Sequence, residues 1–129
     1  MKNLLLALTI MIAILIASCT VRSDGASYSD VSVAELSEML ESKDFTMVNV
    51  HIPFEGDLPQ TDLSIAYHEI EQHLDLLPDK DAPIVLYCRS DRMSRIAAKT
   101  LVENSYTNVY NLEGGFMAWQ AVGLPMAEE

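Results

Sequence analysis

The sequence predicts an α/β fold in which a central parallel sheet carries helices on both faces. Helix and strand patterns alternate along the chain, and this order requires right-handed crossovers that place helices against the sheet. The clearest strand is the short apolar run 84–87, which is typical of a parallel strand covered on both faces. A chain of 129 residues, 50% of them hydrophobic, is long enough for one domain with one core.

The first 19 residues are expected to be a targeting segment that takes no part in the fold. Lys2 gives it a basic start, and the apolar run 4–17 is shorter than the about 20 residues that span a bilayer. Residues 16–19 (IASC) resemble a bacterial lipobox, so we interpret 1–19 as a lipoprotein signal peptide and Cys19 as the lipidated residue. An ordinary signal peptide and an uncleaved short anchor are the alternatives.

Residues 20–30 are small and polar, which favours a flexible tether, and the folded domain is expected to span residues 31–129. A lipidated chain would be anchored to a bacterial membrane in the cell envelope, with the domain facing the periplasm or the exterior. Lipidation of Cys19 would leave Cys88 as the only thiol. Cys88 is then expected to be either buried or reactive, since it has no partner for an internal disulfide.

The first half of the domain is predicted to contain two helices and two strands. Ser32 and Glu35 have the spacing of a capping box, which predicts a helix that runs to about residue 42. Residues 45–50 form a strand candidate, residues 65–67 a short strand, and residues 69–77 a modest helix that Pro78 ends.

A metal site is not expected, and the sequence indicates no cofactor. His68 and His73 lie five residues apart, which does not place them on one helix face. No cysteine or carboxylate stands at ligand spacing from them.

A strand, a loop and a helix follow one another between residues 82 and 104. After the strand, apolar residues recur at i,i+4 spacing, as in the pairs Ala97/Leu101 and Ala98/Val102, which predicts a helix from Ser94. Cys88 therefore lies at the carboxyl end of a strand, where open α/β sheets place their ligand sites.

The chain is predicted to end with a strand and a short helix. Residues 108–112 form the last strand candidate, and two glycines, Gly114 and Gly115, allow a tight turn into the helix. This helix carries Phe116, Trp119 and Val122, and Trp119 is interpreted as a core residue.

The charge distribution excludes one class of partner and favours another. The formal net charge is −11, and beyond residue 19 the chain has 7 basic against 19 acidic side chains. Such a chain is not expected to bind nucleic acid, because phosphate neutralisation needs a basic surface. Three of these seven basic residues, Arg89, Arg92 and Arg95, follow Cys88, so the loop is a positive spot suited to a small anion.

The loop after Cys88 is suited to thiolate chemistry. Backbone N–H groups in a tight turn, continued by those of the first turn of a helix, form a concavity that favours anions. A cysteine at its mouth is favoured as a thiolate, which is the nucleophilic form. The alternative is a small buried hydrophobic residue, but an inert core thiol does not require three nearby arginines.

Two segments resemble single-domain rhodaneses, the thiosulfate sulfurtransferase-like family. These are CRSDRMS (88–94), close to the family form CRSGxRS, and NVYNLEGGFMAW (108–119), followed by Gly123-Leu124-Pro125. The resemblance covers roughly residue 31 to the end and implies a rhodanese-like three-layer fold. Asp91 stands where the family usually has Gly, and Met93 where it often has Arg.

A third segment matches the family only in part. The family usually shows Asp-Val-Arg and then Pro-x-Glu, whereas this chain has Asn49-Val50-His51 and then Pro53-Phe54-Glu55. We interpret His51 as a loop residue or a residue at the rim of the site, with a catalytic base as the alternative.

The resemblance implies two-step covalent catalysis with Cys88 as the nucleophile. Cys88 would take sulfur from thiosulfate or a related small anionic donor and pass it, as a persulfide, to cyanide, a thiol or a protein acceptor. The six loop residues would bind the substrate: Arg89, Ser90, Asp91, Arg92, Met93 and Ser94. Ser94 has a second interpretation as the helix cap.

Three other classes of function remain open. A cell-cycle-type phosphatase or an arsenate reductase would use the same fold with a loop one residue longer and an arginine closing a C-x5-R pattern, where this chain has Ser94. A catalytically weak rhodanese-like module that binds a partner or senses sulfide at the membrane surface is the main alternative, because of Asp91 and Met93. A purely structural lipoprotein fits the loop poorly.

Overall fold

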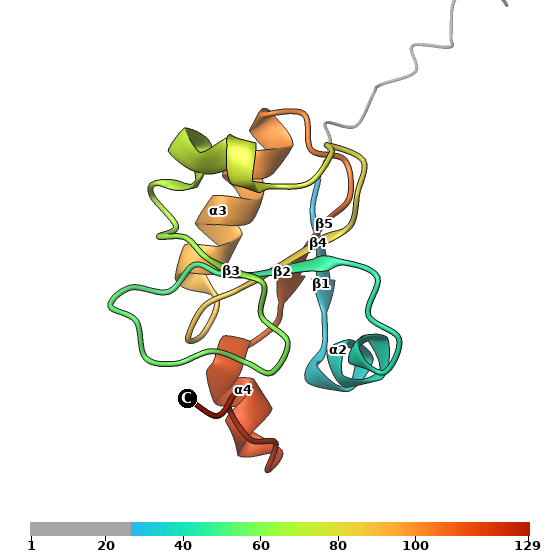
Figure 1. The fold of residues 1–129 in the computed structure, drawn as a ribbon, viewed down its shortest axis with the longest axis vertical. Helices are drawn as coiled ribbons and strands as arrows, with labels where there is room; N and C mark the ends of the chain where they lie inside the picture. Colours follow the sequence, from blue (N-terminus) through green and yellow to red (C-terminus); the bar gives the residue numbers. More distant parts are fainter. Residues whose placement is uncertain (1–26) are drawn as a thin grey trace, which may run out of the picture.

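The computed structural model describes residues 27–129, so the expected signal peptide and Cys19 lie outside the described residues. Within this part of the chain, a single sheet holds all the strands, and its neighbouring strands are all parallel. Its strand order is β1-β5-β4-β2-β3 (Figure 1). The strands are β1 (Ser29–Val31), β2 (Thr46–Asn49), β3 (Leu63–Ser64), β4 (Ile84–Tyr87) and β5 (Val109–Leu112).

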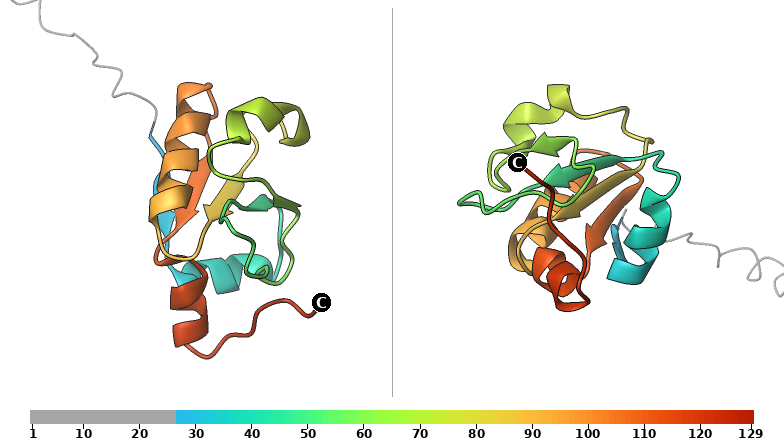
Figure 2. Two further views of the ribbon diagram at one scale, coloured as in Figure 1. Left: turned by 90° about the vertical axis from the view of Figure 1, so that its left-hand side faces the viewer. Right: turned by 60° about the horizontal axis from the view of Figure 1, so that its bottom comes forward.

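Helices cover both faces of this sheet, which gives three layers (Figure 1, Figure 2). The helix α3 (Arg92–Glu103) and the 3₁₀ helix η2 (Ile70–Leu76) lie on one face. The helices α2 (Val33–Leu40) and α4 (Gly115–Ala121) pack on the other. The predicted fold class, a parallel sheet between two helical layers, is confirmed.

The central strand β4 shows how the two cores are divided. Its side chains alternate, because successive residues of a strand point to opposite faces. Ile84 and Leu86 pack in the core beneath α3, and Cys88 follows on the same side. Val85 and Tyr87 pack in the other core, against α2 and α4. The alternation therefore directs Cys88 toward the first turn of α3.

Several predicted elements are confirmed by the structure. Ser32 and Glu35 form the expected capping box, in which each accepts the backbone N–H of the other, at 3.1 and 2.7 Å. The strand at 84–87 has the predicted bounds. Trp119 is buried, and its indole N–H donates to the carbonyl of Pro125.

The predicted short strand at 65–67 is wrong by two residues. The ladder with β2 pairs Val48 with Leu63 and Asn49 with Ser64, and then the chain leaves it. Ile65 is buried, so its apolar character indicated burial rather than pairing.

The predicted helix at 69–77 is only partly correct. It is the 3₁₀ helix η2, interrupted at His73, whose φ of −123° is not helical. Val122, expected on the last helix, lies at its C-terminal boundary and is 65% exposed.

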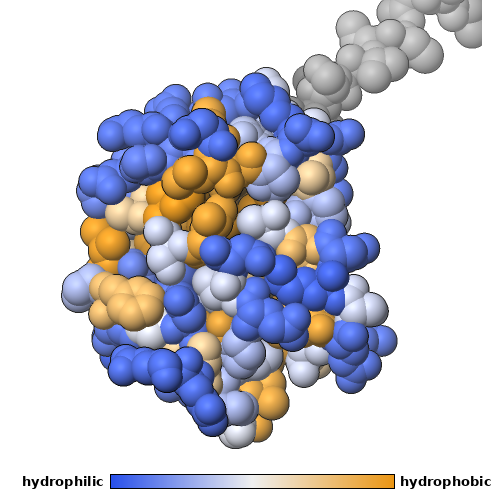
Figure 3. All heavy atoms as spheres, viewed as in Figure 1, coloured by the Kyte–Doolittle hydropathy of each residue, from blue (hydrophilic) through white to orange (hydrophobic). Residues whose placement is uncertain are grey.

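The sequence did not predict β1, which begins two residues before the expected domain boundary at residue 31. Ser29 and Asp30 pair with Tyr110 and Asn111 of β5, so they belong to the sheet. Among the described residues, no helix is both long enough and apolar enough to cross a membrane. The face in Figure 3 is mostly hydrophilic, with a hydrophobic patch near the position of η2 and α3 in Figure 1.

Candidate active site

Cys88 follows β4 directly, and the backbone around it is held by the start of α4. The carbonyl of Cys88 accepts the N–H of Phe116, and the carbonyl of Arg89 accepts the N–H of Met117, both at 3.0 Å. This contact requires glycine at position 115, since a Cβ there would lie 2.3 Å from the Cys88 carbonyl oxygen. Gly115 also has a φ of +58°, which side chains disfavour.

The Cys88 thiol contacts the first turn of α3. Cys88 is only 2% exposed, and its Sγ lies 3.3 Å from Oγ of Ser94. The Ser94 hydroxyl also donates to the carbonyl of Asp91 at 3.1 Å. The interpretation of Ser94 as the helix cap is wrong, because Asp91 occupies the cap position and Ser94 is buried three residues further on.

The loop presents a series of free backbone donors. Within residues 27–129, no protein acceptor is found for the backbone N–H groups of Arg89 to Ser94. Consecutive N–H groups of a turn and a helix N-terminus form a site that favours a negative charge. These are the N–H groups from which the sequence analysis predicted an anion-favouring concavity beside Cys88.

A pocket of about 150 Å³ opens beside the thiol. It is lined by six residues: His51, Cys88, Arg89, Ser90, Arg92 and Met93. Arg89 and Arg92 are exposed, and neither pairs with a carboxylate among the described residues. Two unpaired cations on an acidic protein favour an anionic ligand at this pocket.

Asp91 and Arg95 belong to a network behind the loop. Oδ1 of Asp91 accepts the backbone N–H of Gly114 at 3.1 Å and the side-chain amide of Asn111 at 3.2 Å. Arg95 lies 3.3 Å from Asp30 and 3.6 Å from Asp91. Partial burial lowers the pKa of Arg95, but the two carboxylates outweigh it and raise that pKa above its ordinary value. The network ties the loop to β1 and β5.

His51 reaches the pocket from the loop after β2. Its Nε2 is paired with a carboxylate oxygen of Glu55, and its backbone N–H donates to Oδ1 of Asn49 at 3.0 Å. The imidazole packs edge-on against Phe116, with ring centroids 5.4 Å apart. Its Nδ1 is buried and has no hydrogen-bond partner among the described residues.

The structure brings most of the predicted site residues together around one pocket. Cys88 and four of the six loop residues line it, while Ser94 contacts the thiol from the first turn of α3. Asp91 lies outside the lining, and its carboxylate is directed to Gly114 and Asn111. The sequence analysis did not predict that Glu55 pairs with His51 or that Asn111 donates to Asp91. The four-residue spacing of His51 and Glu55 was a signal for their pairing.

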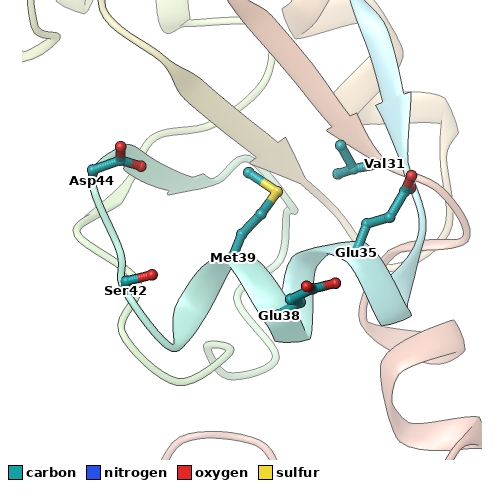
Figure 4. A pocket seen from close by; sticks show the side chains of 6 residues that line it. All are labelled: Val31, Glu35, Glu38, Met39, Ser42 and Asp44. Atoms are coloured by element: carbon teal, nitrogen blue, oxygen red, sulfur yellow. The ribbon is translucent and has the colours of Figure 1, made fainter.

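A larger pocket, of about 490 Å³, lies beside α2 on the other side of the sheet (Figure 4). Three carboxylates line it, those of Glu35, Glu38 and Asp44, and Glu35 already serves in the capping box. Its lining residues include Ser42 but no cysteine or histidine, and its acidic lining disfavours an anionic substrate. Within residues 27–129, no group of three or more His, Cys, Asp or Glu side chains is placed to hold a metal ion.

A family model and several curated relatives match more than half of this chain. The family model described as "Rhodanese-like domain" matches residues 47–122. The sulfurtransferase of Allochromatium vinosum is 33% identical over 102 residues, which cover 76% of this chain and 94% of that protein. Thiosulfate sulfurtransferase GlpE of Pseudoalteromonas translucida is 29% identical over 104 residues, covering 74% of this chain and 91% of that protein.

Solved structures show the same fold. The rhodanese-related protein of Thermoplasma volcanium matches with a TM-score of 0.68 and 24% identity, over 79% of this chain and 100% of that chain. At this level of identity the likeness concerns the fold alone.

Proposed function

The chain belongs to the rhodanese-like domain family, and on that premise we propose that it is a sulfurtransferase. The proposed reaction moves sulfane sulfur from thiosulfate or a related donor to a thiophilic acceptor through a persulfide on Cys88. Relatives named as sulfurtransferases support the reaction class. The observation that carries the proposal is the position of the Cys88 thiol beside a pocket with free backbone N–H groups and two unpaired arginines.

In the first half-reaction, the Cys88 thiolate attacks the outer sulfur of the donor. A bond forms between Sγ and that sulfur while the S–S bond of thiosulfate breaks, and sulfite leaves with the electron pair. Arg89 and Arg92 attract the anionic donor, and Ser90 and Met93 complete the wall of the pocket. When Cys88 ionises, the Ser94 hydroxyl, 3.3 Å from Sγ, turns its single proton from the Asp91 carbonyl to the thiolate and stabilises it.

In the persulfide, the negative charge moves to the outer sulfur. The backbone N–H groups of Arg89 to Ser94 stabilise this charge as an oxyanion hole would, since no protein acceptor is found for them within residues 27–129. Asp91 does not line the pocket, so we assign it a positioning role within substrate binding. In the second half-reaction, cyanide, a thiol or a protein acceptor attacks the outer sulfur and releases the Cys88 thiolate.

A steady-state assay with the full chain tests the reaction class. Wild type is expected to form thiocyanate from thiosulfate and cyanide, and Cys88→Ser is expected to form none above the uncatalysed rate. A wild type inactive with thiosulfate, mercaptopyruvate and polysulfide would contradict the proposal and favour the binding or sensing module. Hydrolysis of an aryl phosphate by wild type but not by Cys88→Ser would favour a phosphatase instead.

We also propose that the chain is a lipoprotein, anchored to a bacterial membrane through Cys19. The support is the sequence alone: a basic start, a short apolar run and the lipobox-like residues 16–19. Cys19 is expected to be the N-terminal residue of the mature protein and to carry lipid, as measured by mass spectrometry of the N-terminal peptide. Cys19→Ser should move the protein out of the membrane fraction, and a mature chain that begins elsewhere would contradict the proposal.

A further inference from the structure

We propose that His51 and Glu55 form a proton-accepting pair that activates thiol acceptors at the Cys88 pocket. The inference rests on the proposed sulfurtransferase function and concerns its second half-reaction, in which sulfur leaves Cys88. It makes His51 a further catalytic residue and Glu55 its positioning residue. The class of acceptor that this site suits is a thiol that is still protonated when it enters the Cys88 pocket.

The first observation is a buried nitrogen without a partner. The His51 side chain is only 8% exposed, and it lines the same pocket as Cys88, Arg89 and Arg92. Its Nδ1 meets neither solvent nor a hydrogen-bond partner in the described part of the chain. Buried polar atoms are nearly always paired, so the unpaired Nδ1 of a pocket-lining residue lacks a partner, and we assign that partner to the acceptor that enters the pocket.

The second observation assigns the proton on the imidazole. Glu55 is paired with Nε2 of His51, and a carboxylate accepts hydrogen bonds, so Nε2 carries the proton in the neutral ring. Nδ1 is then left with a free lone pair. Once Nδ1 takes a proton, the same carboxylate stabilises the imidazolium, as the acidic residue does in nucleophile–histidine–acid triads.

The ring is held in place from several elements. The backbone N–H of His51 donates to Asn49, whose amide in turn donates to Gly56 and Asp57, and Phe116 packs against the imidazole. The charged groups around His51 are Glu55 on its own loop and Arg89 and Arg92 across the pocket, while Asn49 and Phe116 are neutral. No hydrogen bond joins His51 to Cys88 within residues 27–129, although both residues line the same pocket.

The proposed step is balanced in atoms and electrons. Because Nδ1 is covered in the substrate-free structure, the imidazole turns toward the pocket as the acceptor enters, and the S–H proton of the acceptor then passes to Nδ1 of His51. The acceptor sulfur then bonds to the outer sulfur of the persulfide, and the bond from that sulfur to Sγ breaks with its electron pair left on Cys88. The proton returns from His51 to the product, which leaves as a persulfide of the acceptor.

The test measures the second half-reaction alone in the full chain. The persulfide is loaded with thiosulfate or polysulfide, excess donor is removed, and its decay after mixing with an acceptor is followed by intact mass. A simple alkyl thiol with a pKa of about 8.5 is only about 3% ionised at about pH 7, whereas an acidic aromatic thiol is fully ionised there.

The variants are His51→Gln, which keeps a donor for Glu55, and Glu55→Gln. The matched control is His68→Gln, since the His68 side chain is 53% exposed and lies outside the pocket.

When decay is followed from equal amounts of loaded persulfide, His51→Gln is expected to transfer sulfur to the alkyl thiol roughly 10- to 30-fold more slowly than wild type at about pH 7. The defect should disappear with the aromatic thiol and, for the alkyl thiol, above about pH 10, where the acceptor ionises unaided. Glu55→Gln should show a smaller defect of the same kind, and His68→Gln none. An equal loss with both acceptors, or no loss, would overturn the inference while leaving the sulfurtransferase intact. Failure of wild type to form any persulfide would overturn the proposed function and this inference together.

Discussion

The carboxylate of Asp91 accepts the backbone N–H of Gly114 at 3.1 Å, so the loop that follows Cys88 is tied to the turn that begins α4. The amide of Asn111 donates to the same oxygen at 3.2 Å. Asp91 stands where the resembled family usually has Gly, but its φ of −149° is negative, so the left-handed backbone that favours glycine is not required there. The aspartate adds a link between α3, β5 and α4.

Replacement of Asp91 by alanine is expected to lower the free energy of unfolding by about 1–2 kcal/mol, because two donors lose their acceptor. Asp91→Asn is expected to cost less, since its amide oxygen can still accept from Gly114 and only the exposed ion pair with Arg95 is lost. Urea unfolding of the full chain measures both variants. Equal destabilisation by alanine and asparagine would show that the charge, not the acceptor, matters.

Removal of the Ser94 hydroxyl is expected to slow reactions of the Cys88 thiolate. The hydroxyl lies 3.3 Å from Sγ, and a net hydrogen bond of about 1 kcal/mol corresponds to roughly a fivefold change in rate. Alkylation of Cys88 by iodoacetamide at neutral pH gives this rate for Ser94→Ala. Thr100→Ala is the control, because its hydroxyl donates to Ile96 on the same helix. Unchanged alkylation in Ser94→Ala would remove Ser94 from the mechanism.

Alanine substitutions at Gly115 and Gly123 distinguish the effect of backbone strain from the effect of steric crowding at the site. Gly115 and Gly123 have φ values of +58° and +84°, but only a Cβ on Gly115 would strike the backbone of Cys88 and Arg89. Gly123→Ala is expected to cost about 1–2 kcal/mol in stability and to retain activity. Gly115→Ala should cost about 1–3 kcal/mol more, and the displaced loop should lose most of its sulfurtransferase activity. Equal effects on stability and activity would contradict the close packing of α4 on the loop.

The two pocket arginines are expected to act on donor binding. Arg92→Ala and Arg89→Ala should each raise the KM for thiosulfate several-fold with a smaller change in kcat, and added salt should reduce the difference from wild type. Lys99→Ala is the control, because Lys99 is exposed on the same helix and its ammonium pairs only with Glu103 among the described residues. The same rise in KM in Lys99→Ala would mean that overall charge, rather than the pocket, attracts the donor.

Patterns confined to a few residues were sufficient to predict the strand before Cys88 and the helix after it. The strand 84–87 is a continuous apolar run, and the i,i+4 pairs that follow it place Ala97, Ala98 and Leu101 in the core. The capping box of Ser32 and Glu35 likewise depends only on residues three apart. Because Cys88 follows a buried parallel strand, the position of the site could also be predicted from the sequence.

Features that depend on distant partners could not be predicted. The strand β1 is short and mostly exposed, and it exists because β5 offers it a ladder partner about 80 residues further on. The role of Asp91 depends on Asn111 and Gly114, which the fold brings to it. The position of His51 at the rim of the site was predicted from the sequence, but its packing against Phe116 and its pairing with Glu55 were not.

The decisive measurement is the intact mass of the full chain after incubation with thiosulfate, for wild type and for Cys88→Ser. A gain of one sulfur atom is predicted for wild type and none for Cys88→Ser. Subsequent addition of cyanide should remove the sulfur and release an equal amount of thiocyanate. A wild-type mass that does not change with thiosulfate, mercaptopyruvate or polysulfide, or a gain that persists in Cys88→Ser, would contradict sulfur transfer through a Cys88 persulfide.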